Sequence, residues 1–136
     1  QIDKEIPYHI LFLLEYDGKY QAWIGYKEAS ESGKNTFKVT RYYHTDWMEE
    51  ENLPLQIEGL NIDSIYDNFV RQIAGDALQA DKSESLKESV EKETLRLNLQ
   101  KQISVLEAKM CKEKQFNRQL EINTKIKELR KELANI

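Results

Sequence analysis

Cysteine, proline and glycine are scarce in this chain of 136 residues, which contains one Cys, two Pro and five Gly. The single cysteine, Cys111, excludes an intramolecular disulfide and is typical of a reducing compartment. No apolar run reaches the roughly 18 residues that a membrane-spanning helix needs, so we expect a cytoplasmic protein without a membrane span. The chain opens on Gln1 rather than Met and shows no signal peptide, and we interpret it as a piece of a longer protein.

Recognisable catalytic motifs are also missing from the sequence. It has no Gly-rich phosphate loop, no HExxH, no paired CxxC and no GxSxG. Two histidines and one cysteine cannot form an ordinary zinc site. We therefore expect no metal, no cofactor and no catalytic activity in this piece, which leaves open whether the longer protein is an enzyme.

Charge is unevenly distributed along the chain, whose net charge is −4. Residues 1–81 carry 7 Lys and Arg against 15 Asp and Glu, whereas residues 82–136 carry 13 against 9. A basic tail on an acidic body favours a charged partner at the tail. The alternative is that these mixed-charge helices are simply solvated.

Three strands are indicated in the first third of the chain. The nearly continuous apolar run Tyr8–Tyr16 is typical of a buried strand. Asp17-Gly18 is a strong signal for a hairpin turn, and Lys19–Lys27 then alternates between apolar and polar residues. A third alternating segment, Thr36–His44, follows a polar loop around Gly33 over residues 28–35.

A helix is expected to cover one face of this sheet. Apolar residues recur at helical spacing within Ile57–Gly75, with Asn61 or Asp63 as the N-cap and Gly75 as the C-cap. Residues 1–75 are therefore predicted to form a small α+β domain. The polar, aperiodic residues 76–84 are predicted to be a linker.

The last third of the chain, from Ser83 to Ile136, has neither Gly nor Pro and repeats apolar residues every three or four positions. We predict an amphipathic helical hairpin or a single coiled coil over residues 85–136. A reversal near Lys112–Lys114 would pair Leu106 with Leu120 and Leu99 with Ile126 in an antiparallel register. Because Leu97 and Val105 fall outside the main stripe, we also expect self-association, most simply as a symmetric dimer.

The densest polar and aromatic segment lies at the end of the third predicted strand. His44 and Asp46 there could serve as an acid–base pair, although no nucleophile accompanies them, and packing of aromatic residues is the alternative. We take this segment as a candidate polar-aromatic site made of Tyr42, His44, Asp46 and Trp47.

Two further groups of residues are candidate sites. Glu15 and Lys27 lie on neighbouring predicted strands, as in the core of a metal-dependent nuclease, but without the usual spacing or a second acidic ligand. Basic residues gather around the predicted reversal of the tail, where they favour DNA backbone or an acidic protein surface. These candidate binding residues are Lys109, Lys112, Lys114 and Arg118.

Four segments carry a resemblance to a known family: FLLEYDGKYQAWIGYKE, YYHTDW, LPLQIEGLNIDSIYDNFVRQIAG and KEKQFNRQLEINTKIKELRKEL. They resemble the C-terminal part of a bacterial family described only as a domain of unknown function, DUF4391. The resemblance implies genes that lie beside helicase and DNA methyltransferase genes in restriction-like defence loci, and it transfers no catalytic residue.

We therefore expect a non-catalytic interaction or accessory module of a bacterial restriction or defence-type system. It would bind helicase and methyltransferase partners through its helical tail, form a homo-oligomer, and contact DNA only as a secondary role. The alternative is a fragment of a metal-dependent nuclease whose remaining site residues lie upstream of residue 1.

Overall fold

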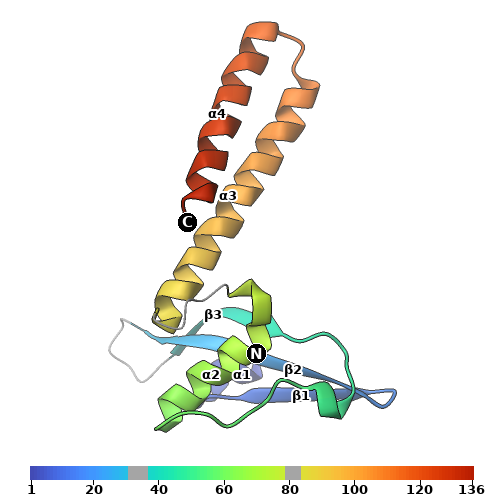
Figure 1. Ribbon diagram of the computed structural model, residues 1–136, viewed down its shortest axis with the longest axis vertical. Helices are drawn as coiled ribbons and strands as arrows, with labels where there is room; N and C mark the ends of the chain where they lie inside the picture. The colour runs from blue at the N-terminus through green and yellow to red at the C-terminus, as the bar shows by residue number, and fades with distance from the viewer. Residues whose placement is uncertain (31–36, 79–83) are drawn as a thin grey trace. The chain divides into compact units, whose positions relative to one another are not determined.

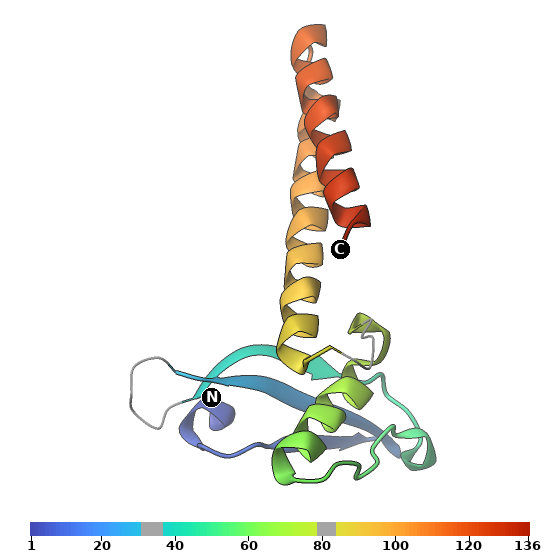
Figure 2. The ribbon, with the colours of Figure 1, turned by 60° about the vertical axis from the view of Figure 1, so that its left-hand side comes forward.

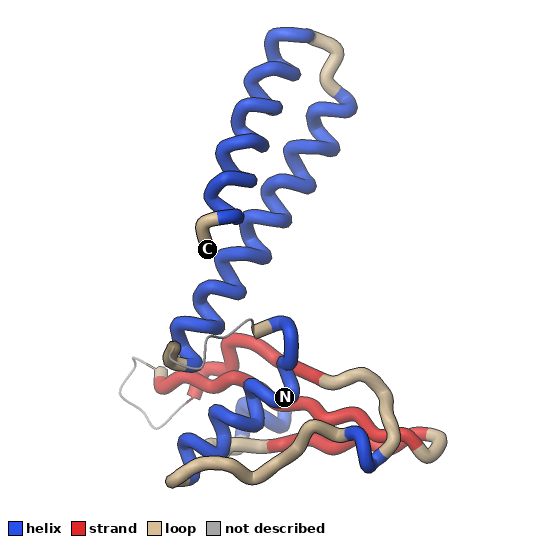
Figure 3. The backbone as a smooth tube through the Cα atoms, viewed as in Figure 1, coloured by secondary structure: helices blue, strands red, loops and turns tan. Residues whose placement is uncertain are grey.

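The computed structural model describes residues 1–30, 37–78 and 84–136, and it divides the chain into two compact units, Gln1–Leu78 and Gln79–Ile136 (Figure 1). The fold is α+β, with one three-stranded antiparallel sheet. All three strands belong to the first unit, and the described part of the second unit is helical (Figure 3). None of the helices in the described ranges combines the length and the hydrophobicity needed to cross a membrane.

The sheet has the order β1-β2-β3, with β1 at Leu11–Tyr16, β2 at Lys19–Ala29 and β3 at Phe37–His44. The predicted hairpin between the first two strands is correct. Asp17 and Gly18 both have positive φ, 50° and 72°, as a type I′ turn requires. β2 continues two residues further than predicted, while Gly33 and Thr36 lie outside the described residues.

The first strand differs from its prediction in both length and burial. It begins at Leu11 rather than Tyr8, and it is largely exposed, with exposed fractions of 52% for Leu13 and 44% for Leu14. β1 is an edge strand that pairs only with β2, and the pairing stops where Leu11 meets Ile24. The apolar run therefore predicted a strand correctly. It did not predict burial, because burial depends on which other elements cover the strand.

The predicted covering helix is present as α2, Ile62–Ala74 (Figure 1). Its N-cap is Asn61 rather than Asp63, because the Asn61 side chain accepts a hydrogen bond of 2.8 Å from the Ser64 amide. The Ser64 hydroxyl oxygen in turn accepts a hydrogen bond of 3.1 Å from the Asn61 amide, which completes a capping box. Gly75, with φ of 53°, ends the helix and starts a short 3₁₀ turn, η2 (Gly75–Ala77).

The core of the first unit lies between α2 and one face of the sheet. Alternation along the strands places Ala22 and Ile24 on the same face, and Tyr43 joins them as the cross-strand partner of Ile24. Burying each large apolar side chain contributes about 1.5–3 kcal/mol. The buried residues of this core include Ala22, Ile24, Tyr26, Tyr43, Tyr66, Val70 and Ile73.

A short helix, α1 (Ile2–Glu5), crosses the opposite face of the sheet. Gly25 makes this approach possible, because a Cβ atom at that position would lie 2.5 Å from the Asp3 carboxylate and 3.1 Å from the Tyr42 ring. Further along the chain, the one-turn helix η1 (Glu50–Asn52) follows an antiparallel bridge between Tyr20 and Met48.

The second unit consists of α3 (Leu86–Lys112) and α4 (Phe116–Ala134), which lie side by side in both views (Figures 1 and 2). Ser85 and Glu88 form a capping box at the start of α3. The apolar residues most deeply buried along the two helices include Leu99, Ile103 and Ile126. Of the predicted linker, residues 79–83 lie outside the described residues.

The register of the two helices differs from the predicted pairing. Glu107 forms an ion pair with Arg130 at 2.6 Å, whereas pairing Leu106 with Leu120 would place Glu107 beside Gln119, about three helical turns away. The backbone at Glu113 and Gln115 is extended, so the connection carries the start of α4 beyond the end of α3 (Figure 1). Leu120 is consequently 49% exposed rather than buried against Leu106.

Candidate functional site

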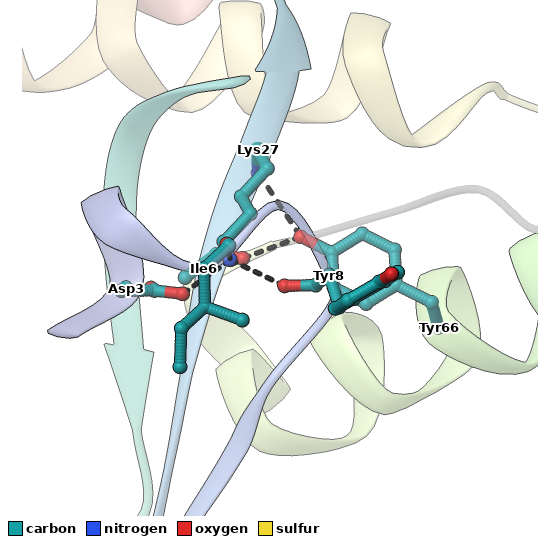
Figure 4. A network of polar contacts seen from close by, with 6 residues as sticks. Asp3, Ile6, Tyr8, Lys27 and Tyr66 are labelled. Carbon is teal, nitrogen blue, oxygen red and sulfur yellow. Dashed lines mark hydrogen bonds and ion pairs between the residues drawn. The ribbon is translucent and has the colours of Figure 1, made fainter. Parts of the chain in front are cut away.

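A buried lysine lies at the centre of the first unit. The Lys27 side chain is only 1% exposed and forms an ion pair with Asp3, whose side chain is 3% exposed (Figure 4). The Lys27 ammonium also donates hydrogen bonds to the carbonyl oxygens of Tyr8 at 2.5 Å and Ile6 at 3.4 Å. One ammonium group therefore holds three points of the N-terminal segment against β2.

Tyr66 from α2 completes this buried cluster. Its hydroxyl accepts a hydrogen bond of 3.0 Å from the Lys27 amide and donates a short one to the Gly25 carbonyl. These backbone groups lie just past the point where β1 stops pairing with β2, so the hydroxyl supplies the bonds that another strand would make. The His9 ring stacks on the Tyr66 ring with 3.7 Å between centroids, and this explains why Tyr8–Ile10 do not extend β1.

Burial sets the protonation of these groups. It raises the pKa of Tyr66 to about 12, so the phenol stays protonated and keeps donating to Gly25. Desolvation, reinforced by the charge of Lys27, lowers the pKa of His9. Asp3 is held by its ion pair with Lys27, and the geometry of the cluster is that of a clamp fixing residues 1–10 to the sheet. Their arrangement supports a structural role.

The surface more suited to recognition is the sheet face crossed by α1. Strand alternation and cross-strand pairing place Phe12 with Trp23 and His44, and Trp23 stacks on His44 with 4.3 Å between ring centroids. Trp47, just beyond β3, packs edge-on against Tyr16 with 6.2 Å between the ring centroids. We call this surface the aromatic face; it comprises Phe12, Leu14, Tyr16, Trp23, Tyr42, His44 and Trp47.

Gln21 orders the middle of the aromatic face. Its side-chain amide donates to the Thr45 carbonyl at 2.8 Å and approaches His44 Nδ1 at 3.2 Å. Its carbonyl oxygen accepts from Trp23 Nε1 at 2.8 Å. An open pocket of about 310 Å³ lies at the α1 end of the face, where Phe12, Trp23 and Tyr42 meet Gln1, Ile2 and Asp3.

The predicted polar-aromatic site is only partly brought together. Tyr42 and His44 lie on the aromatic face, and Trp47 joins it through Tyr16. His44 Nδ1 instead lies 2.9 Å from the Thr45 carbonyl, and no hydrogen bond or ion pair among the described residues joins it to Asp46. Asp46 is exposed at the edge of the face. The arrangement therefore offers a binding surface, and it does not form the acid–base pair that the sequence suggested.

Glu15 and Lys27 lie on neighbouring strands, as predicted, but they are too far apart to form one site. Glu15 pairs with Tyr20 beside the hairpin turn, and its carboxylate accepts from the Gly18 amide at 3.3 Å. Lys27 lies seven residues further along β2, roughly 23 Å away at about 3.3 Å per residue. Within the described ranges, no group of three or more His, Cys, Asp or Glu side chains is placed to hold a metal ion.

The four basic residues predicted as a binding cluster are all exposed around the α3–α4 connection. Lys109 and Lys112 belong to the last turn of α3, Lys114 to the connection, and Arg118 to the first turn of α4. The Glu113 carboxylate organises this region by accepting from the Gln115 and Lys114 amides, both at 2.9 Å, and these bonds lower its pKa.

A second pocket, of about 430 Å³, lies close to the connection, and exposed apolar side chains contribute to it. Phe116 is 69% exposed and Leu120 49% exposed, and both line the pocket with Cys111, which is also exposed. The remaining lining residues are Met110, Gln119 and Asn123. The connection thus combines apolar and basic side chains.

Sequence reasoning missed Asp3, His9 and Tyr66 as partners of Lys27. Asp3 and Tyr66 lie far from Lys27 in the chain, and none of the three belongs to a motif. The available signals were weak: a lysine in phase with Gly25 and Trp23 along a strand, and a tyrosine on the apolar stripe of a helix.

Comparison with known proteins gives one family. No curated protein and no solved structure matches the chain. The family model described as "Domain of unknown function (DUF4391)" matches residues 1–133. Because this match covers nearly the whole chain, the chain belongs to the DUF4391 family.

Proposed function

We propose that this chain is a non-catalytic interaction module, an accessory of a bacterial restriction or defence-type system that works with helicase and methyltransferase partners. The gene neighbourhood implied by the family resemblance suggests the system, and a fold or family alone does not define a mechanism. The proposal therefore depends on the surfaces of the chain rather than on its membership of the family.

One observation carries the proposal: both units expose large apolar side chains. In the first unit, Tyr16 is 74% and Trp47 43% exposed. In the second, Phe116 is 69% and Val105 60% exposed. Isolated exposed apolar residues are ordinary, but contiguous groups usually mark contact surfaces. Tyr16 with Trp47, and Phe116 with Leu120, are contiguous groups of this kind.

We assign partner contact in the second unit to a long helical hairpin built from α3 and α4. Its apolar residues near the connection would bind a protein surface, and a second copy of the chain would cover further apolar residues such as Leu97 and Val105. Lys109, Lys112, Lys114 and Arg118 would add attraction for an anionic surface. DNA is the secondary ligand, held weakly and without sequence preference through its phosphates.

The cytoplasm is the compartment that we propose for the protein. Its only cysteine, Cys111, is exposed and has no second cysteine in the chain to pair with, which suits a reducing environment.

Co-purification tests the main proposal. The protein would be co-expressed with a helicase and a methyltransferase taken from the gene neighbourhood that the resemblance implies, and captured through an affinity tag. We expect at least one partner to be retained, and Phe116→Ser with Leu120→Ser to reduce that retention. Leu60→Ser is the matched control, because Leu60 is fully exposed and lies in the first unit. Recovery of neither protein, under conditions where the chain is folded, would contradict the proposal.

DNA binding is tested separately by a mobility-shift titration at low salt. We expect weak binding that falls steeply with salt and that Lys112→Glu with Lys114→Glu weakens equally on all sequences. No shift below about 100 μM, the weak end of non-specific affinities, would remove DNA and leave protein docking.

A further inference from the structure

The end of the β1–β2 hairpin carries an apolar surface that the clamp around Lys27 does not use. Leu14 and Tyr16 lie on the aromatic face, and Trp47 contacts Tyr16. Their exposed fractions are 44%, 74% and 43%. We call Leu14, Tyr16 and Trp47 the hairpin-end patch. Tyrosine and tryptophan are the residues most enriched among energetically dominant interface contacts.

The charged side chains around the patch are mainly acidic. Segments 11–22 and 42–53 together contain six acidic residues and one basic residue, Lys19. Lys19 is the cross-strand partner of Tyr16. The antiparallel bridge between Tyr20 and Met48 brings the second segment back to the hairpin, with hydrogen bonds of 2.7 and 2.9 Å. The exposed carboxylates are those of Asp17, Asp46, Glu49, Glu50 and Glu51, together with Glu15 on the opposite face of β1.

We infer that the hairpin-end patch docks a basic amphipathic segment of a partner protein, one that presents Arg or Lys side chains beside apolar residues. This inference rests on the proposed function and names the partner chemistry of a second surface. An arginine guanidinium can stack on the Trp47 or Tyr16 ring and at the same time bind a neighbouring carboxylate in a planar, two-pronged contact. Apolar residues of the same segment would cover Leu14.

Charge selects this occupant over nucleic acid. A phosphate backbone carries dense negative charge and would be repelled by the carboxylates that border the patch. A segment of neutral charge would leave them solvated and gain only the apolar contact. A basic segment gains both, and its association is accelerated by the opposite charge of the surface.

The size of the surface also fits a short helix. Phe12 and Tyr16 are separated by four residues of β1, or about 13 Å at about 3.3 Å per residue. A helix covers that distance with about nine residues at 1.5 Å each. The pocket bounded by Phe12, Trp23 and Tyr42 lies at the far end of this path and can accept one apolar side chain.

Fluorescence anisotropy with defined peptides tests the inference on the full chain. The probe is a labelled 14-residue helical peptide made of Leu, Ala and Arg, and the matched control replaces each Arg with Glu. We expect saturable binding of the Arg peptide and about tenfold weaker binding, or less, of the Glu peptide. Trp47→Ala should weaken the Arg peptide about tenfold or more, while Trp47→Phe, which keeps a ring, should retain most of the affinity.

Two further variants separate charge from apolar contact. Replacing Glu49, Glu50 and Glu51 by Gln should weaken the Arg peptide and flatten its salt dependence. Leu60→Ser should leave binding unchanged, because Leu60 is exposed outside the patch. A thermal melt of each variant shows whether the fold is retained. If Trp47→Ala unfolds the chain, Tyr16→Ser and the Gln variant still decide the question.

Several outcomes would overturn the inference. They are absence of Arg-peptide binding up to about 1 mM, equal binding of the Glu peptide, and direct binding of labelled single-stranded DNA that Trp47→Ala weakens. A further contrary outcome is a dimer that Trp47→Ala converts to monomer, because a second copy would then occupy the patch. If a helicase or methyltransferase still co-purifies with the Trp47→Ala protein, the proposed function stands, but the hairpin-end patch is not the surface that binds that partner.

Discussion

Each unit of this molecule contains an ion pair between a carboxylate and a basic side chain, but one pair is buried and the other is exposed to solvent. Asp3 and Lys27 meet with side chains 3% and 1% exposed, whereas Glu107 and Arg130 meet with side chains 42% and 62% exposed. Burial removes the hydration of both charges in the first pair, so each charge depends on its partner. Water screens the second pair and can replace either partner. The contribution of an ion pair to the free energy of unfolding therefore depends on the exposure of its charges as well as on the distance between them.

The buried pair should show the largest effect. Lys27→Met leaves the Asp3 carboxylate buried without its counter-charge and releases the carbonyls of Ile6 and Tyr8. We expect a loss of about 3–5 kcal/mol of unfolding free energy, the usual cost of breaking a buried pair. Urea denaturation followed by circular dichroism measures it. Adding Asp3→Leu to Lys27→Met should recover much of the loss, and no recovery would show that the pair does not act as a unit.

Removing the Tyr66 hydroxyl should have the next largest effect. Tyr66→Phe keeps the ring that stacks on His9 but leaves the Gly25 carbonyl and the Lys27 amide without this partner. Buried backbone groups left unsatisfied in this way cost about 1–3 kcal/mol. The same denaturation experiment measures the change, with Tyr16→Phe as the control at an exposed tyrosine. Equal stability of both variants would mean that water replaces the hydroxyl.

The exposed pair should matter least among these contacts. Arg130→Ala removes the contact with Glu107, and exposed pairs contribute about 0.2–1 kcal/mol. We expect the difference from the unmodified chain to shrink in 1 M salt, where the screening length is about 3 Å. A loss above 2 kcal/mol that salt leaves unchanged would show that Arg130 stabilises α4 by packing instead.

The smallest expected effect is a shallow dependence of stability on acid. Desolvation lowers the pKa of His9 below its ordinary value of 6.5, so the unfolded chain binds a proton more readily than the folded one. The stabilisation by neutral His9 is therefore complete above about pH 6.5 and is lost as the pH falls through the lower folded value. His9→Gln should reduce the slope of unfolding free energy against pH between about 5 and 7.

Asp67 provides a check on this assignment. Its pKa is raised, chiefly by burial, so the folded chain binds its proton more readily and stability gains as pH falls toward 4. The two groups therefore act in opposite directions, and they also interact, because the Asp67 carboxylate raises the pKa of His9. Asp67→Asn should abolish the gain of stability in acid and leave the loss from His9 in place, and a gain that persists in this variant would contradict the assignment of Asp67.

The turns and helix ends of this protein follow from residues that are close together in the chain. Asp17-Gly18 specified a hairpin because both residues tolerate positive φ, and Asn61 and Gly75 bounded a helix because they satisfy its free amide and carbonyl groups. The apolar stripe of residues 85–136 predicted helices, and the residues near 113 interrupt them. These features depend on neighbours in the chain, which the sequence lists directly.

Which charges are buried and which apolar residues are exposed depends instead on how distant segments pack together. The sequence offers no reason to join Asp3, Lys27 and Tyr66, because they come from three separate elements that meet only when α1 and α2 pack on opposite faces of β2. It likewise predicted a buried first strand that the sheet leaves at an edge. Periodicity fixes the face of an element on which a side chain lies. What covers that face, and in which register, depends on contacts between distant segments.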